Sequence, residues 1–387
     1  MQNKQLTDKI YYIGVDDKEI DLFEGQYVVP NGISYNSYVI MDEKIAIMDT
    51  VDIHKSEEWL SNLSVVLKDK TPTYLVVLHM EPDHAGSIAQ LIEKYPTIQI
   101  VSNQKAFQMM EQFFEGLDIQ GRAHFVKEGD VLSLGEHSLT FVMAPMVHWP
   151  EVMVAYENSQ KVLFSADAFG KFGALDADEE WDCEARRYYI NIVGKYGAPV
   201  QSLLKKASTL DIQKIFPLHG PMLESNLAYY INKYNIWSSY QAEDEGVFIA
   251  FTSIYGNTKE AALKLKDILL EKGAKKVAIA DLARDDMAEC VEDAFRYSHL
   301  VLASPTYDGD VFPYMSTFMH HLKSKNFQNK TVGFIENGTW APMAASIMMK
   351  EMASLKNMKL IEEKVTIKSA LKKQDINALE KLAEALL

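Results

Sequence analysis

The segment LHMEPDHAG, residues 78–86, places two histidines and two carboxylates directly after a short apolar run at Tyr74 to Leu78. The run predicts a buried strand. The polar residues that follow it are His79, Glu81, Asp83 and His84. A loop at the end of a strand can aim all four side chains inward, and imidazole with carboxylate suits a divalent transition metal. This stretch therefore predicts a metal site.

Three further candidates lie at the ends of strands predicted later in the chain. They are His148 in APMVHWPE, Asp167 in LFSADAFG and His219 in FPLHGP. A single residue of this kind is more often a structural polar group than a ligand. The remaining histidines have no such context, and we interpret them as structural or solvated: His54, His124, His137, His299, His320 and His321.

The seven residues together resemble the metallo-β-lactamase superfamily, whose usual motif is His-x-His-x-Asp-His followed by a distant His, Asp and His. In this chain Glu81 replaces the second histidine, and that substitution is the mark of the flavodiiron proteins, also called A-type flavoproteins. The resemblance implies two non-haem irons. Their ligands would be His79, Glu81 and His148 for one iron, Asp83, His84 and His219 for the other, and Asp167 as the bridge.

The charges of these residues favour iron over zinc. Glu81, Asp83 and Asp167 bring three negative charges against the four positive charges of two ferrous ions, and neutral imidazoles add none. A small positive charge and open positions remain for an exogenous ligand. A carboxylate in place of an imidazole makes the site harder, which suits iron. Such a site can change oxidation state, whereas a zinc hydrolase cannot.

The chain of 387 residues is too long for one hydrophobic core, and 48% hydrophobic with 24% charged residues is typical of packed globular domains. The first part predicts strands at 38–41, 44–48, 74–78, 98–101, 139–143, 152–156 and 161–165, with helices at about 55–68, 84–94 and 104–114. The pattern is lost in an acidic stretch at 226–245. We expect domains at 1–245 and 246–387. The resemblance to the metallo-β-lactamase superfamily implies that the first domain is an αββα sandwich.

From Gly246 onward, apolar strands alternate regularly with helical patterns. The strands are GVFIAFTS, KKVAIADL, HLVLASPT, KTVGFIEN and LIEEKVTI. Five strands alternating with helices over about 140 residues predict a doubly wound parallel sheet, which binds its ligand in loops at the carboxyl ends of the strands.

The first of these loops, TSIYGNT at 252–258, resembles the phosphate loop of flavodoxins. Its residues are Ser253, Ile254, Tyr255, Gly256, Asn257 and Thr258. Hydroxyl groups and the N–H groups at a helix start can surround a phosphate without any Lys or Arg. No GxxxxGK[ST] motif is present. FMN, which has a single terminal phosphate, therefore fits better than ATP or NAD.

Two later loops, ASPTYDGDVFP and ENGTWAP, follow strands where this fold would hold the rest of a flavin. Their candidate contacts are Ser304, Pro305, Thr306, Tyr307, Asp308, Gly309, Asn337, Gly338, Thr339 and Trp340. Trp340 and Tyr307 are candidates for stacking on the flavin, or for simple packing. Both loops resemble flavodiiron proteins more closely than free flavodoxins. Tyr307 and Asp308 depart from the family's usual residues, as does Glu151, where Asp is frequent.

The resemblance covers essentially the whole chain, which ends at Leu387 without a rubredoxin or flavin reductase extension, so we expect the two-domain class. It implies an enzyme in which FMN passes electrons to the di-iron site, where dioxygen is reduced to water or nitric oxide to nitrous oxide. The choice between these gases stays open. The resemblance also implies a head-to-tail homodimer, or a dimer of such dimers.

A net charge of −15 disfavours nucleic acids and anionic membranes as partners. The start MQNKQLTDKI has no apolar signal segment, and no stretch reaches the about 20 apolar residues of a membrane span, so we expect a cytoplasmic protein. Cys183 and Cys290 are too few for a disulfide scaffold or a four-cysteine iron centre. The electron donor is therefore expected to be a separate molecule: rubredoxin, a reduced flavoprotein or a deazaflavin.

Two other functions remain open at this point. One is a zinc hydrolase that uses a metal-bound hydroxide, with the flavodoxin-like domain serving only for binding. Glu81 argues against it. The other is an electron carrier or redox sensor with a vestigial metal site, and the chemical competence of all seven presumed ligands argues against that.

Overall fold

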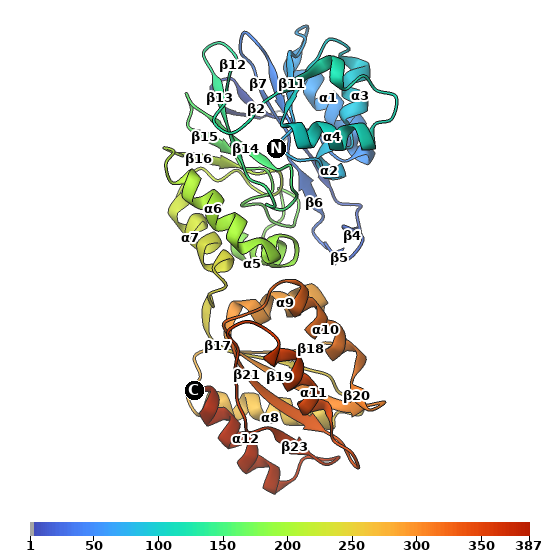
Figure 1. Cartoon of the computed structure of the whole chain (residues 1–387), viewed down its shortest axis with the longest axis vertical. Helices are drawn as coiled ribbons and strands as arrows, with labels where there is room; N and C mark the ends of the chain where they lie inside the picture. The colour runs from blue at the N-terminus through green and yellow to red at the C-terminus, as the bar shows by residue number, and fades with distance from the viewer. Residues whose placement is uncertain (1–3) are drawn as a thin grey trace. The chain divides into compact units, whose positions relative to one another are not determined.

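The computed structural model describes residues 4–387 and divides into two compact units (Figure 1). The first unit comprises the chain up to Tyr189 together with Ala198–Asn235, and the second comprises Ile190–Gly197 and Ile236–Leu387. The first three residues of the predicted N-terminal domain lie outside the described part. The predicted boundary after residue 245 stays a prediction. No helix within residues 4–387 is long and apolar enough to cross a membrane.

The first unit contains two main sheets. The larger has the order β1-β2-β7-β8-β9-β10-β11: β1 (Gln5–Thr7), β2 (Ile10–Tyr12), β7 (Tyr38–Ile40), β8 (Ala46–Met48), β9 (Tyr74–Val76), β10 (Gln99–Ser102) and β11 (Ala123–Phe125). Its pairs are antiparallel from β1 to β8 and parallel from β8 to β11. Strands β7, β8 and β9 are buried along their whole length, which explains why they read as continuous apolar runs.

The second sheet has the order β12-β13-β14-β15-β16, and only its last pair is parallel. Its strands are β12 (Val131–Ser133), β13 (Ser138–Met143), β14 (Met153–Glu157), β15 (Val162–Phe164) and β16 (Lys214–Phe216). Two short pairs stand beside the main sheets: β3 (Val15–Asp17) with β6 (Ile33–Tyr35), and β4 (Leu22–Phe23) with β5 (Tyr27–Val28).

Helices flank these sheets, as an αββα sandwich requires (Figure 1). They are α1 (Ser56–Leu67), α2 (Pro82–Ala85), α3 (Ile88–Lys94), α4 (Gln104–Phe113), α5 (Trp181–Tyr188), α6 (Gly197–Ala207) and α7 (Leu227–Ser238). The helical pattern predicted at about 84–94 is found mainly as α3, and the chain breaks between the end of α2 at Ala85 and the start of α3 at Ile88. At the break, a Cβ on Gly86 would lie 2.5 Å from the Pro82 carbonyl, so only glycine fits there.

The second unit contains a parallel sheet with the order β18-β17-β19-β21-β22, the arrangement of a flavodoxin-like doubly wound fold. Its strands are β17 (Asp244–Phe251), β18 (Val277–Asp281), β19 (Tyr297–Tyr307), β21 (Thr331–Asn337), β22 (Lys359–Leu360) and β23 (Val365–Ile367); β20 (Asp310–Val311) pairs antiparallel with β19. Its helices are α8 (Asn257–Glu271), α9 (Met287–Arg296), α10 (Pro313–Ser324), α11 (Ala344–Ala353) and α12 (Lys373–Leu386). The predicted fold class is confirmed for both parts of the chain.

Candidate metal centre and cofactor pocket

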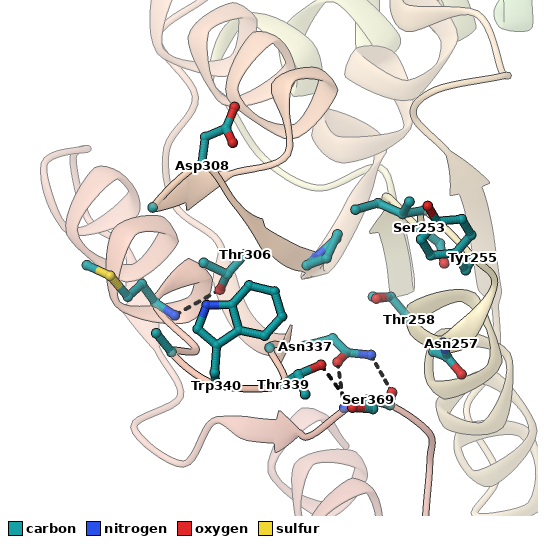
Figure 2. Close-up of a pocket in the computed structure, with 16 residues that line it drawn as sticks. Ser253, Tyr255, Asn257, Thr258, Thr306, Asp308, Asn337, Thr339, Trp340 and Ser369 are labelled. Atoms are coloured by element: carbon teal, nitrogen blue, oxygen red, sulfur yellow. Dashed lines mark hydrogen bonds between the residues drawn. The ribbon is translucent and has the colours of Figure 1, made fainter.

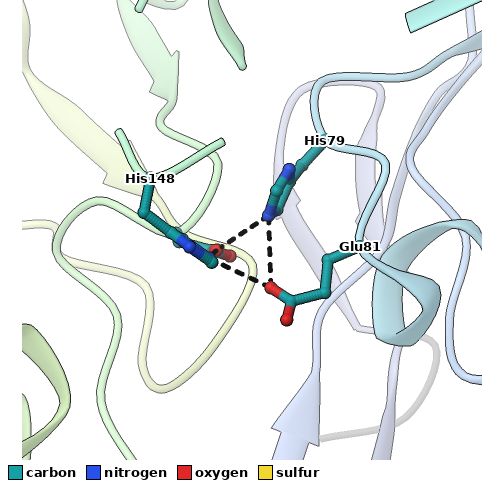
Figure 3. Close-up of side chains that lie close together, drawn as sticks. His79, Glu81 and His148 are labelled. Carbon is teal, nitrogen blue, oxygen red and sulfur yellow. Dashed lines mark hydrogen bonds and ion pairs between the residues drawn. The ribbon is translucent and has the colours of Figure 1, made fainter. Parts of the chain in front are cut away.

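Four of the predicted ligands form a first donor cluster: His79, Glu81, His148 and Asp167. Figure 3 shows the side chains of His79, Glu81 and His148 pointing toward one another. Glu81 Oε2 lies 3.3 Å from His79 Nε2 and 3.0 Å from His148 Nε2. The donor atoms of the cluster all lie within 4.8 Å of one another. Two imidazoles and two carboxylates at this spacing can surround one divalent ion.

The other three predicted ligands, Asp83, His84 and His219, form a second donor cluster. Asp83 Oδ2 lies 3.3 Å from His84 Nε2 and 3.2 Å from His219 Nε2. The two imidazole nitrogens are 3.0 Å apart. All three side chains are buried, and His84 and His219 are fully so. This cluster offers one carboxylate and two imidazoles to a second ion.

Asp167 links the two clusters through its two carboxylate oxygens. Its Oδ2 lies 3.3 Å from His79 Nε2 and 3.0 Å from His148 Nε2 in the first cluster. Its Oδ1 lies 3.1 Å from His84 Nε2 and 3.8 Å from His219 Nε2 in the second. One carboxylate thus faces both groups of ligands, which is the position that a bridging ligand between two metal ions needs.

The loop after β9 is held in place by two carboxylates outside the predicted ligand set. Asp49 Oδ1 accepts hydrogen bonds from the N–H groups of Leu78 and His79, at 2.7 and 3.3 Å. Glu151 Oε1 accepts from the N–H of Met80 and lies 2.8 Å from His79 Nδ1. Because Nδ1 is engaged by Glu151, the Nε2 atom of His79 is left to face the cluster, as in the carboxylate–histidine pairs of metal sites.

Burial and neighbouring charges shift the pKa values of several side chains in the two clusters. Burial disfavours a charged imidazole, but the negative charge of Asp167 and the hydrogen bonds to Asp167, Glu151 and Glu81 together outweigh burial and raise the pKa of His79 well above its usual value. Hydrogen bonds to Asp167 and Glu81 likewise outweigh burial and raise the pKa of His148 to about 9. In the second cluster, burial raises the pKa of Asp83 to about 7. A cation that binds here therefore competes with protons.

The donor atoms fit a pair of metal ions. Asp83 Oδ1, Asp83 Oδ2 and Asp167 Oδ1 are buried and, within the described chain, have no hydrogen-bond partner. A buried polar atom without a partner is costly, about 1–3 kcal/mol or more for a charged group. Metal ions bound by the two clusters would satisfy these oxygens. Nitrogen and oxygen donors without any sulfur suit iron, zinc or manganese.

Glu151→Gln should weaken the binding of a divalent metal about 10- to 100-fold, because it removes the negative charge that makes His79 a stronger ligand. The amide retains the shape and an acceptor oxygen, so the fold should persist. Competition between the protein and a chromogenic chelator for Co²⁺ measures the effect. Glu157→Gln is a matched control: Glu157 is also fully buried, but its oxygens bind the turn residues Ser159 and Gln160. Equal metal affinities of the two variants would refute this role of Glu151.

The second unit has a cavity of about 480 Å³ at the carboxyl ends of its strands. Figure 2 shows side chains from four segments around it, with Thr258, Thr306, Asn337 and Ser369 among them. The lining residues are Ser253, Ile254, Tyr255, Asn257, Thr258, Pro305, Thr306, Asp308, Gly309, Asn337, Gly338, Thr339, Trp340, Ala341, Met343 and Ser369. Segments that are far apart in the sequence thus form one pocket.

The start of α8 has the geometry of an anion cradle. Gly256 precedes the helix with a φ of +94°, a left-handed conformation that glycine adopts without strain. Ser253 Oγ accepts a hydrogen bond from the Gly256 N–H at 3.1 Å. Thr258 is buried at the first turn of the helix and lines the cavity. The hydroxyls and the helix N-terminus together can hold a phosphate.

Most predicted flavin residues line the cavity, but Gly256, Ser304 and Tyr307 do not. Ser304 is fully buried behind it and bonds to Thr252, and the ring of Tyr307 packs on Phe312 at 5.4 Å. Trp340 lines the cavity with 91% of its surface exposed. A flat aromatic ligand could cover such a ring. The roles of these residues stay predictions.

Three lining residues were not among the predicted flavin contacts: Ala341, which lies within the predicted ENGTWAP loop, Met343 and Ser369. Ser369 follows β23, and its carbonyl accepts a hydrogen bond from the Asn337 side chain in the third loop at 2.8 Å. Its hydroxyl group shares a hydrogen bond with the hydroxyl of Thr339 at 2.9 Å. The rule that ligands bind at the carboxyl ends of parallel strands also covers the loop after the last strand. That rule could have indicated Ser369, although no motif marks it.

Comparison with known proteins found a family model that matches the first part of the chain and relatives that match nearly all of it. The family model described as "ODP family beta lactamase" matches residues 33–220, the segment that carries all seven predicted metal ligands. A nitric oxide reductase from Moorella thermoacetica is 29% identical over 98% of this chain and 97% of its own length.

Two solved structures match the chain over its whole length. The rubredoxin oxygen:oxidoreductase from Desulfovibrio gigas has a TM-score of 0.92 and 26% identity, covering 100% of this chain and 98% of the other. The flavodiiron protein from Giardia intestinalis has a TM-score of 0.91 and 25% identity, covering 100% and 97%. The similarity therefore extends over both units and their order in the chain.

Proposed function

The chain belongs to the flavodiiron family of A-type flavoproteins, and on that premise we propose an oxidoreductase that passes electrons from FMN to a non-haem di-iron centre. There it reduces dioxygen to water, nitric oxide to nitrous oxide, or both. The observation that carries the proposal is the position of Asp167, whose two oxygens face the two donor clusters. Glu81 in the first cluster adds a carboxylate that suits iron.

The residues of the two clusters have distinct tasks in this proposal. His79, Glu81 and His148 hold one iron, Asp83, His84 and His219 hold the other, and Asp167 holds both. When bound, the two irons supply changes of oxidation state and open positions for a gas, and FMN supplies electrons singly or in pairs. Carboxylates keep the net charge of the centre low in both oxidation states. The surrounding buried side chains restrict water.

The residues of the cavity bind and orient the flavin. The hydroxyls of Ser253 and Thr258 and the N-terminus of α8 hold its phosphate. The ring is held by the cavity-lining residues of segments 304–309 and 337–340, and Ser369 supports the second of these segments. No lysine or arginine lines the described cavity, so neutral donors carry the phosphate. This arrangement suits a mononucleotide better than a dinucleotide.

Thr258→Val should weaken FMN binding about 10- to 100-fold, since it removes a hydrogen bond to a charged phosphate while it retains the volume of the side chain. Quenching of FMN fluorescence on titration with the apoprotein measures the affinity. Thr317→Val on α10 provides the control, because the Thr317 hydroxyl bonds to Pro313 and does not line the cavity. Unchanged FMN affinity of Thr258→Val would count against the phosphate cradle. The metal content should stay normal in both variants.

The protein is proposed to act in the cytoplasm as a head-to-tail homodimer in which the flavin of one chain faces the di-iron centre of its partner. Electron transfer needs the two cofactors close together, and the clusters and the cavity lie in different units of the chain. A two-fold dimer is the common solution for such a pair of surfaces. A chain with two cysteines fits a reducing compartment. Electrons would come from a separate donor such as rubredoxin, a reduced flavoprotein or a deazaflavin.

Anaerobic turnover tests the proposed function. The reduced protein is mixed with limiting dioxygen or nitric oxide, and the candidate donors are added one at a time. Consumption of at least one gas, with water or nitrous oxide as the product, is expected. A protein that binds iron and FMN but consumes neither gas with any donor would refute the proposal.

A further inference from the structure

A small apolar cleft lies in the first unit, where helices α6 and α7 cover strands β15 and β16 (Figure 1). Its volume is about 150 Å³. The lining residues are Leu163, Phe169, Leu204, Ala207, Ser208, Leu210, Ile212, Ile215 and Ile231. All of them except Ser208 have apolar side chains, and none is charged. The cleft therefore offers nothing that would hold an ion.

The cleft runs from the surface of the unit to a buried floor. At its mouth, Ile231 on α7 is 37% exposed. At its floor, Phe169 and Ile215 are buried. Protein cavities of about 150 Å³ with apolar walls stay dry and take up benzene or xenon. The cleft should therefore favour a small apolar molecule over water.

The floor of the cleft lies next to the second donor cluster. Phe169, which lines the cleft, follows Asp167 by two positions. The next residue, Gly170, is in contact with the second cluster, because a Cβ on it would lie 3.2 Å from the Cβ of His219. One dipeptide, Phe169–Gly170, thus separates the apolar cleft from a predicted metal ligand.

The two strands at the floor also lead to the donor clusters. Leu163 of β15 pairs with Ile215 of β16. Asp167 follows four residues after Leu163, and His219 follows four residues after Ile215. Four residues of chain span at most about 14 Å between Cα atoms. The cleft is therefore close to the bridging position and to the second cluster at the same time.

The Phe169 ring is the one side chain of the separating dipeptide, since Gly170 has none. The backbone N–H of Phe169 donates a hydrogen bond to the hydroxyl of Tyr234 at 2.6 Å. Its ring packs on the ring of Tyr234, with the centroids 4.3 Å apart. The wall between the cleft and the second cluster is thus a single aromatic ring in a defined position.

The second cluster has no direct opening to solvent at its imidazoles. His84 and His219 are fully buried. A molecule that reaches ions bound there must therefore pass between packed side chains. An uncharged diatomic gas can occupy apolar space of this kind, whereas an ion would lose its hydration there.

We propose that the cleft is a binding and entry site for a small uncharged gas, from which dioxygen or nitric oxide passes the Phe169 ring to the second cluster. This inference rests on the proposed function, because it needs the two clusters to hold iron. The cleft collects the gas from solvent, and its apolar walls keep water and ions from following.

Xenon is the first probe, because it is small, apolar and heavy enough to be located by anomalous diffraction. Crystals of the unchanged protein under xenon pressure should show xenon in the cleft, against Phe169 and Leu210. Ala207→Phe, at the end of α6, places a ring in the cleft and should exclude the xenon. Ala198→Phe is the matched control, because Ala198 is exposed at the start of the same helix and does not line the cleft. A cleft without xenon in the unchanged protein would overturn the inference.

The second measurement is the rate at which nitric oxide binds to the reduced, iron-loaded protein, followed by stopped-flow absorbance at limiting gas. Ala207→Phe should bind nitric oxide several-fold more slowly than the unchanged protein and Ala198→Phe. Its iron content, its FMN content and its equilibrium affinity for nitric oxide should stay normal, because the substitution narrows the route and leaves the ligands in place. If Ala207→Phe does not fold, Leu210→Trp fills the cleft from the loop after α6.

The outcomes separate this inference from the proposed function. A filled cleft that excludes xenon but leaves the binding rate normal would overturn the entry route. Lost iron or weaker equilibrium binding in the filled variants would also overturn it, since the substitution would then act on the metal ligands. A protein that shows the expected xenon site and slower binding, but consumes neither gas with any donor, would refute the proposed function alone. An unchanged protein that holds no iron would defeat both.

Discussion

Asp167→Ala is expected to lower gas-dependent turnover by more than about 100-fold while FMN stays bound. Mutation of a residue that only hydrogen-bonds to a metal ligand can already lower activity by up to about 100-fold, and Asp167 is itself a predicted ligand. Among residues 4–387, Asp167 is the one residue whose two oxygens face both groups of donor atoms. Its removal leaves the two ions without a bridge and takes one negative charge from the centre. Elemental analysis and flavin absorbance after gel filtration measure the metal and FMN contents, and gas electrodes measure turnover.

Asp42→Ala is the control for the loss of a buried carboxylate in the same unit. The Asp42 side chain pairs with His137 at 3.0 Å and with Lys9 at 3.5 Å, away from both clusters. This variant should lose stability but retain iron and turnover per folded chain. Asp167→Ala that retains both irons and normal turnover would contradict the proposed bridge.

Mixing two inactive variants should restore about a quarter of the normal activity. One variant lacks the metal centre through His84→Ala with Asp167→Ala, and the other lacks FMN through Ser253→Ala with Thr258→Val. After random exchange of subunits about half of the dimers are mixed, and one of the two flavin–iron pairs in each mixed dimer is intact. The proposed dimer therefore predicts that activity rises from almost none in each variant alone to about a quarter of normal in the mixture.

Two observations make the mixing experiment decisive. Each variant mixed with itself, under the same exchange conditions, should stay inactive. Light scattering must show that mixed dimers form. Mixed dimers that form but stay inactive would contradict the head-to-tail arrangement, as would a monomer with full turnover.

The sequence allowed the architecture to be predicted where local periodicity carries the information. The regular alternation after Gly246 predicted the parallel sheet, since buried parallel strands read as apolar runs between amphipathic helices. The break between α2 and α3 was not predicted, and neither was the close approach of Gly86 to the Pro82 carbonyl at that point. A helical pattern does not record such contacts.

The same distinction holds for the candidate sites. The seven predicted metal ligands belong to recognisable motifs, and the structure brings their donor atoms together in two clusters. Asp49 and Ser369 belong to no motif, because each contacts the sites through folding of distant segments. Asp49, for instance, accepts hydrogen bonds from the Leu78 and His79 N–H groups about 30 residues later. Such residues become visible only when the strands are paired.

The central claim is that the two clusters form a redox-active iron centre that takes electrons from the flavin. The most direct test is the rate at which dioxygen or nitric oxide re-oxidises the reduced FMN. Stopped-flow absorbance measures this rate in iron-loaded and in zinc-loaded protein. The account predicts rapid re-oxidation with two irons per chain and a rate lower by more than about 100-fold with zinc, which cannot change oxidation state. Equal rates with iron and zinc would contradict it.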